Sequence, residues 1–171
     1  MALNAYIKID GIAGGSTASK HKDEIEVLSF SWGIKNSSTS GGGGGGAGKA
    51  TVSDFSFTKE VAKDSPELFV SVCTGEHHKN AVLTVEGLSA NAKGASQSFY
   101  KVTFEDVLIS GVSLAGQNES VPLEQVSLNF SKVKIEFRDA SGGTKGEVCD
   151  FEGGKDFDGV TNTDAVERSG R

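Results

Sequence analysis

The residues that come nearest to a chemical motif are Gly43 and Gly48-Lys49, which have the spacing of a phosphate-binding loop. Such a loop needs a Ser or Thr after the lysine to hold magnesium, and a helix whose N-terminus faces the phosphate. Here Ala50 follows the lysine, and the next residues alternate as in a β-strand. The sequence therefore favours an ordinary glycine-rich loop over a nucleotide site.

A second candidate is a metal site formed by Cys73, His77 and His78. A structural zinc site needs a second Cys or His pair, and the sequence has none at a suitable spacing. Cys73 also falls on the apolar face of a predicted helix, so we interpret it as a buried thiol beside two surface imidazoles. Because two cysteines are too few for a disulfide framework, we predict that both are free thiols.

A third candidate is acid–base chemistry, either at His21 with Glu24 or at the pair Glu24 and Glu26. No set of nucleophile, base and orienting residue accompanies them, and a pair of glycosidase acids would need a cleft that the sequence does not indicate. We predict that His21 forms hydrogen bonds within a loop and that the glutamates lie on a solvated strand edge. A hydrolase using His21 and Glu24 is a minor alternative. We otherwise expect no enzyme activity, no catalytic residue, no metal and no cofactor.

The bulk properties exclude several classes of protein. The chain has 171 residues and a net charge of −6, which argues for one domain and against a nucleic-acid groove. No stretch approaches the ~20 apolar residues of a membrane span. Residues 1–6 lack the basic and apolar segments of a secretory signal, so we expect a cytoplasmic protein, unless a machine exports it without a signal.

The elements that would position functional residues are organised around residues 24–34, which alternate as one β-strand. Leu28, Phe30 and Trp32 share one face, with Ile34 after them, and we predict that they are buried as core anchors. Ser29 and Ser31 share the opposite face, which is small and polar. A sheet with one dry and one wet side would leave these two serines to line water or a partner.

Other segments complete a mainly β protein. Further strands are expected at 5–10, 50–61, 81–88, 98–112, 121–137 and 145–151. One helix should begin at Pro66, after a cap at Asp64 or Ser65, and end before Gly75. Phase changes within 98–112 and at 131–132 indicate bulges, or a strand that crosses between two sheets, and suggest that the sheet curls into a barrel. Residues 36–48 form a long Ser- and Gly-rich loop. We assign residues 1–151 to one domain and residues 152–171 to an acidic tail.

Several motifs resemble the haemolysin-coregulated protein (Hcp) family of type VI secretion. They are KIDGI at 8–12, HKxEIxVLSFSWG at 21–33, GKAxVxDFSFTK at 48–59, SPxL at 65–68, CxGxH at 73–77 and VxLNFSKV at 126–133. The likeness covers roughly residues 1–138, in order and with matching spacing. It implies a two-sheet β-barrel with one lateral α-helix and an extended Gly-rich loop.

The resemblance also implies a function. Hcp proteins form hexameric rings that stack into a tube, which a contracting sheath expels with a spike and its effector proteins. Ser29 and Ser31 are then expected to face the lumen and the effectors. The loop is expected to contact the next ring through Ser40, Gly41, Gly44, Gly46, Gly48 and Lys49. The alternative is a monomeric β-barrel that binds a small ligand or peptide, which the mass of the particle in solution would distinguish.

Overall fold

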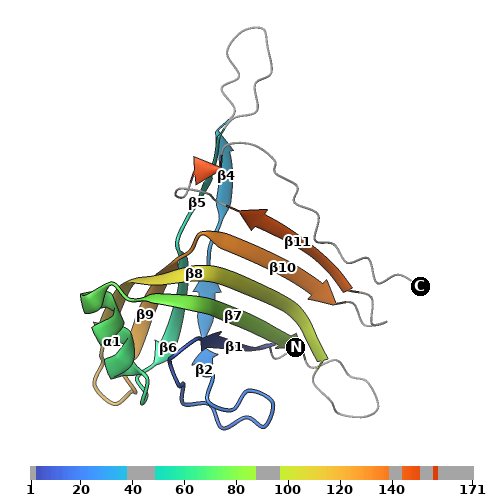
Figure 1. Cartoon of the computed structure of the whole chain (residues 1–171). Coiled ribbons are helices and arrows are strands. Elements are labelled where there is room, and N and C mark those ends of the chain that lie inside the picture. The colour runs from blue at the N-terminus through green and yellow to red at the C-terminus, as the bar shows by residue number, and fades with distance from the viewer. Residues whose placement is uncertain (1–2, 38–48, 88–96, 139–143, 151–155, 158–171) are drawn as a thin grey trace, which may run out of the picture.

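The computed structural model of the chain describes residues 3–37, 49–87, 97–138, 144–150 and 156–157 (Figure 1). These residues form twelve β-strands and one α-helix, so the predicted mainly β class with a lateral helix is confirmed. The main sheet contains β1 (Leu3–Ile9), β2 (Ile25–Val27), β3 (Ser29–Ser31), β6 (Phe55–Glu60), β7 (His77–Gly87), β8 (Gln97–Ala115), β9 (Leu123–Asn129), β10 (Lys132–Arg138) and β11 (Thr144–Asp150). A small second sheet contains β4 (Ile34–Ser37), β5 (Lys49–Val52) and β12 (Asp156–Phe157).

The main sheet is antiparallel and follows the order β2-β1-β7-β8-β9-β6-β3. Strand β8 is long enough to pair with two different strands along the same edge. Its first half pairs with β10 and its second half pairs with β9, while β11 extends the sheet beyond β10. Both phase changes expected from the sequence lie where β8 changes partner.

The first phase change lies at residues 105–106 of β8. Phe104 and Val107 are both buried, and the two residues between them are exposed. Asp106 has a φ of 53°, a left-handed value that aspartate tolerates better than most residues do, and the register with β7 is the same on both sides of it. The second change is the break between β9 and β10 at residues 130–131. Both predicted slips are therefore confirmed.

The predicted barrel is wrong in one respect, because the sheet curls without closing. The two ends of the strand order, β2 and β3, are consecutive in the chain and are joined by Leu28 alone. At this corner the Leu28 amide donates to the Thr58 carbonyl at 2.8 Å, and β2 lies against β6. No ladder joins β2 to β3 or to β6 among the described residues. Strands of three residues are too short to pair on both sides while the chain turns between them.

The buried apolar residues are mostly valine and isoleucine, and a cluster of phenylalanines lies among them. Phe104 lies at its centre, with ring centroids 4.9 Å from Phe55 and 4.7 Å from Phe130. Phe55, Phe57 and Phe104 are almost completely buried. Burying each such side chain stabilises the fold by roughly 1.5–3 kcal/mol relative to leaving it exposed.

The stretch 24–34 is not the single strand that its alternation predicted. It is divided into β2, β3 and the start of β4, which pair with three different strands. In β2 the buried residues are Ile25 and Val27, so the core-facing phase slips at Leu28. The expectation that Leu28 is a core anchor is therefore wrong, because its side chain is 51 % exposed at the corner.

The other two expected anchors do contact the core. Phe30 is 39 % exposed but stacks on Phe55 at 6.1 Å. Trp32 lies in the link between β3 and β4, where it is half-buried and packs edge-on against Phe104 and Phe130 at 5.9 and 6.2 Å. The indole therefore covers the end of the phenylalanine cluster, and Ile34, the last residue of the predicted face, is 53 % exposed beyond it.

Helix α1 (Ser65–Thr74) follows its sequence signals closely. Asp64 is the N-cap residue, Pro66 lies in the first turn, and Gly75 ends the helix with a φ of 67°. Leu68 is fully buried and Val72 packs against the core. Phe69, however, is 62 % exposed, and Cys73, which the sequence placed on the apolar face, is exposed as well.

The long loop and the acidic tail fall largely outside the described residues. Strands β4 and β5 form a hairpin stem that rises from the main sheet in Figure 1. The predicted contact residues Ser40, Gly41, Gly44, Gly46 and Gly48 lie between its strands and outside the described ranges, and Lys49 is the first residue of β5. Within the predicted tail, β12 pairs with β5.

Candidate functional site

Ser29 and Ser31 are exposed on the outer face of β3, and Phe30 between them points the other way onto Phe55. This is the alternation expected for a strand with one dry side. The sequence therefore predicted correctly which face these serines share. What the sequence did not show is which other residues lie beside them.

The strand register extends the pair into a hydroxyl-bearing surface across four strands. One row joins Ser31 of β3 to Ser56 of β6, then to Ser127 of β9 and Gly111 of β8. The row beside it joins Ser29, Thr58, Gln125 and Ser113 in the same strand order. We call this surface the hydroxyl face, and its members are Ser29, Ser31, Ser56, Thr58, Ser110, Ser113, Gln125 and Ser127.

The hydroxyl face is tightly organised at its centre. The Ser110 hydroxyl donates to Asp54 Oδ2 at 2.8 Å, and it lies 2.9 Å from the Ser127 hydroxyl. Gly111 leaves room for these groups, because a Cβ at this position would lie 2.9 Å from Ser127 Oγ. A register shift between Ile109 and Gly111 brings Ser110 to this side of the sheet.

The opposite side of the same strands carries the core residues Phe55, Phe57, Val126 and Leu128. The ribbon thus has a dry apolar side and a wet side of short, mostly neutral hydrogen-bonding groups. Such groups make weak contacts with any polar surface and keep water between them. The arrangement suits a smooth wall better than a site for one defined ligand.

The metal interpretation receives no support from the described residues, in which no group of three or more His, Cys, Asp or Glu side chains converges. Two of our expectations about these residues are wrong. Cys73 is exposed rather than buried, and His78 is buried rather than on the surface. His78 Nδ1 donates to the Asp10 carbonyl at 2.8 Å, and its Nε2 lies 2.7 Å from the Ser71 hydroxyl, so it ties α1 to β1 and β7.

His21 forms a buried cluster with Glu24, Glu86 and Tyr6. Its Nδ1 is 2.8 Å from Glu24 Oε2, which confirms the expected hydrogen bond in the loop, and its Nε2 is 3.1 Å from Glu86 Oε1 on β7. The ring stacks on Tyr6 at 4.3 Å. Burial lowers the pKa of His21, but its contacts with Glu86 and Glu24 outweigh burial, so the pKa lies above the ordinary histidine value.

The His21 cluster holds the loop between β1 and β2 against the sheet. The imidazole is packed on one face and contacted at both nitrogens, and no catalytic nucleophile accompanies it among the residues of the cluster. Its geometry is that of a structural contact, as the sequence analysis favoured.

A second buried cluster, around Lys59, was missed in the sequence. Lys59 Nζ lies 2.9 Å from Glu124 Oε2 and 3.1 Å from Asp64 Oδ2, and it donates to the Glu60 carbonyl at 2.7 Å. Ser65 also donates to Glu124 at 2.7 Å. The available signal was the spacing Phe55-x-Phe57-x-Lys59, which places the lysine on the core side of β6.

Comparisons with known proteins agree with the motifs. The family profile described as "Type VI secretion system effector, Hcp" matches residues 6–137. Protein hcp1 of Pseudomonas aeruginosa is 40 % identical over 141 residues, which are 81 % of this chain and 85 % of that protein. Hcp1 from Salmonella typhimurium has a crystal structure that superposes with a TM-score of 0.76 at 36 % identity, covering 92 % of this chain and all of that one.

A further solved structure, of a type VI secretion system effector from Yersinia pestis, is 30 % identical with a TM-score of 0.71. It covers 85 % of this chain and 98 % of that one. The resemblance to the Hcp family that the sequence motifs indicated is thereby confirmed.

No helix among the described residues is both long and apolar enough to span a bilayer.

Proposed function

Because the chain belongs to the Hcp family of type VI secretion proteins, we propose that it is a structural subunit of the inner tube of a type VI secretion machine. In this proposal six copies form a ring, and rings stack into a tube that a sheath expels together with the spike. In this proposal the protein is made in the bacterial cytoplasm and leaves with the machine. Its role is structural rather than catalytic.

The observation that carries the proposal is the hydroxyl face. A channel through which folded proteins pass needs a wall without apolar patches or strong charges. The wet side of β3, β6, β9 and β8 offers short polar groups over a rigid sheet. We propose that this face, with Ser29 and Ser31, lines the lumen and holds effectors through many weak hydrogen bonds, each contributing about 1 kcal/mol or less.

The sheet edges give a second reason to expect assembly. Among the residues that the structure describes, β2, β3 and β11 end the main sheet and have no ladder partner on one side. Exposed edges invite uncontrolled association, and closed rings are one way to cover them. For the contact between rings, we propose that the loop carried by the β4–β5 hairpin reaches the next ring through Ser40, Gly41, Gly44, Gly46, Gly48 and Lys49.

Light scattering on the purified chain tests the assembly. We expect a particle with about six times the chain mass of 17.8 kDa, and electron microscopy should show rings that stack. A chain that stays monomeric at every concentration would overturn the proposal and favour the monomeric binding module.

The loop contact is tested by limited proteolysis, in which cleavage within 38–48 should be slower in tubes than in single rings. Equal rates would contradict the loop contact.

The lumen assignment is tested by Ser31→Trp, with Ser19→Trp as the matched control at an exposed serine away from the hydroxyl face. We expect both variants to form rings. Only Ser31→Trp should reduce the amount of a co-expressed effector that is recovered with the ring. Equal recovery from both variants would show that the hydroxyl face does not contact cargo.

A further inference from the structure

An apolar surface with acidic borders lies on α1. Phe69 and Val70 are 62 % and 55 % exposed, on the side of the helix opposite the buried Leu68. Glu67 in the first turn and Glu76 just beyond the helix end are exposed, and with Val70 they line a hollow of about 290 Å³. The last turn of α1 carries no basic residue. We call Glu67, Phe69, Val70 and Glu76 the α1 strip.

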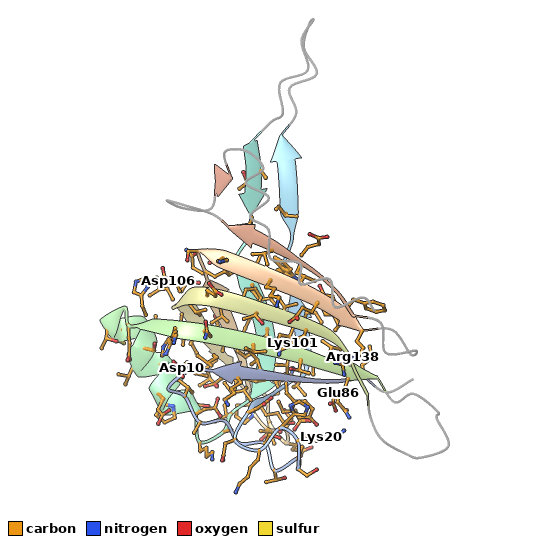
Figure 2. All side chains as sticks on the ribbon, turned by 45° about the vertical axis from the view of Figure 1, so that its right-hand side comes forward. Asp10, Lys20, Glu86, Lys101, Asp106 and Arg138 are labelled. Atoms are coloured by element: carbon orange, nitrogen blue, oxygen red, sulfur yellow. The ribbon has the colours of Figure 1, made fainter. Side chains whose placement is uncertain are left out.

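A complementary surface lies at the far end of β8 and β10. Phe137 is 50 % exposed, and the neighbouring Lys101 and Arg138 are exposed cations. Neither cation forms an ion pair within the part of the chain that the structure describes, and Glu136, which pairs with Lys101 across the strands, is engaged by Lys134 at 3.3 Å. We call Lys101, Phe137 and Arg138 the β10 end, which Figure 2 shows with Lys101 and Arg138 on neighbouring strands.

The two surfaces lie at opposite ends of the sheet. Helix α1 leads into β7 at His77, whereas Phe137 pairs with Tyr100, which pairs in turn with Val85 of β7. Eight residue steps of strand therefore separate the two ends, or roughly 26 Å. Both views place α1 on one side and the ends of β8 and β10 on the other. One copy cannot bring its own two surfaces together.

We propose that the β10 end of one copy docks on the α1 strip of the next copy, and that this is a contact that closes the ring. Phe137 enters the hollow beside Val70, while Lys101 and Arg138 face Glu67 and Glu76. This inference rests on the proposed function, because it assumes that the chain assembles. Since two different surfaces meet, the contact is head-to-tail, and repeating it by rotation generates a closed ring.

Charge complementarity is the reason for choosing a second copy as the occupant. The chain has a net charge of −6, so copies repel one another over most of their surface. The β10 end offers cations that are not engaged within the described residues, and the α1 strip is acidic at its borders. Apolar anchors surrounded by complementary charges are the composition expected of a specific protein contact.

Disulfide trapping tests the contact directly. Cys73 is exposed on α1, one turn beyond Phe69. In a Cys149→Ser background, Arg138→Cys should form disulfides with Cys73 of neighbouring copies under mild oxidation, giving a ladder of up to six chains. Within one chain the sites are much farther apart than the 4.4–6.8 Å between Cα atoms that a disulfide spans. Ser19→Cys in the same background is the control and should give no ladder.

Charge reversal gives an independent readout. Glu67→Lys with Glu76→Lys, and separately Lys101→Glu with Arg138→Glu, should each weaken assembly about tenfold or more, as measured by the concentration at which rings dissociate. Combining all four changes in one chain should restore most of the loss. Far-ultraviolet circular dichroism confirms that each variant is folded.

The outcomes separate the two proposals. If the parent chain forms rings that neither trap at Arg138→Cys nor respond to charge reversal, the docking contact is overturned and the tube function stands. If the parent chain never assembles, both are overturned. A ladder with Arg138→Cys, together with rescue by the fourfold charge swap, supports the contact.

Discussion

Two buried clusters in this protein have the same arrangement of charges but differ in the type of side chain at the centre. Around Lys59, and around His21, a single cationic side chain lies between two carboxylates and ties a non-strand segment to the sheet. Lys59 ties the start of α1 to β6 and β9, whereas His21 ties the loop before β2 to β7. The central group is an amine in one cluster and an imidazole in the other, and the pKa of the His21 imidazole is raised above its ordinary value.

The two clusters have the same arrangement of charges, but their central side chains have different numbers and kinds of contacts. Lys59 also donates to a backbone carbonyl and to Ser65, so its ammonium group has partners on several sides. His21 relies instead on stacking against Tyr6 and on its two carboxylate contacts. The connection at α1 should therefore be the stronger one, and the connection at the loop should be weaker and dependent on pH through His21.

The largest effect is expected from Lys59→Met. Removing the ammonium group leaves Asp64 and Glu124 buried side by side without a counter-charge, which should cost about 3–5 kcal/mol in the free energy of unfolding. Urea unfolding measures the loss. Lys63→Met is the control, because Lys63 forms an exposed pair with Asp23 and should change stability by less than about 1 kcal/mol. Equal losses would show that burial does not distinguish the two lysines.

A smaller loss is expected from Gly14→Ala, which tests what else holds the loop before β2. The Gly14 amide donates to the Asp23 carbonyl at 2.7 Å, and a Cβ at Gly14 would lie 2.2 Å from backbone atoms of Glu24. The backbone must shift, at a cost of about 1–3 kcal/mol by overpacking. Gly15→Ala is the matched control, because its Cβ would meet only Ala62 at 3.4 Å. Similar stability of the two variants would show that the loop adapts freely.

The pH dependence of His21→Gln should distinguish the two clusters. The folded pKa of His21 is raised above its ordinary value of 6.5, so its contribution to stability is full below about pH 6.5 and is lost as the pH rises through the folded value. The free energy of unfolding should differ most between parent and variant at pH 5–6.5 and converge in alkali. A difference that is constant from about pH 5 to 9 would contradict the assignment.

The smallest effect is expected from Asp64→Asn. Among the described residues, neither side-chain oxygen of Asp64 has a hydrogen-bond partner. The Asp64 carboxylate lies against Lys59, which would keep its contact with Glu124. The change removes one ion pair and also the excess negative charge of the cluster, so stability should change by less than about 1 kcal/mol. Glu124→Gln, which also disturbs the contact with Ser65, should cost about 1–3 kcal/mol. The reverse order, measured by urea unfolding, would show that Lys59 depends mainly on Asp64.

Several parts of the fold were predictable because local signals and tertiary structure agree. Pro66 and Gly75 restrict the backbone wherever they occur, so they gave the bounds of α1. The phase changes in β8 and between β9 and β10 could be predicted because the alternation of apolar and polar residues is interrupted at these points. The alternation around Ser29 and Ser31 predicted the polar face for the same reason.

The errors have a common origin in partners that are distant along the chain. Leu28 alternates in phase with Phe30, but the chain changes sheet edge there, so its side chain lies at a corner. His78 was expected at the surface, and Lys59 was not singled out in the sequence. They are buried because Asp10 and Ser71, or Asp64 and Glu124, supply partners from other elements.

The sequence by itself determined the β class, the helix, the family motifs and the polar face of β3, because these depend on periodicity and on backbone restrictions within a few residues. Only the tertiary structure decided that four strands share the hydroxyl face, that the sheet stays open at Leu28, and which ionic side chains are buried. Register and burial are set by contacts between residues that are tens of positions apart. A local sequence pattern does not identify these distant partners.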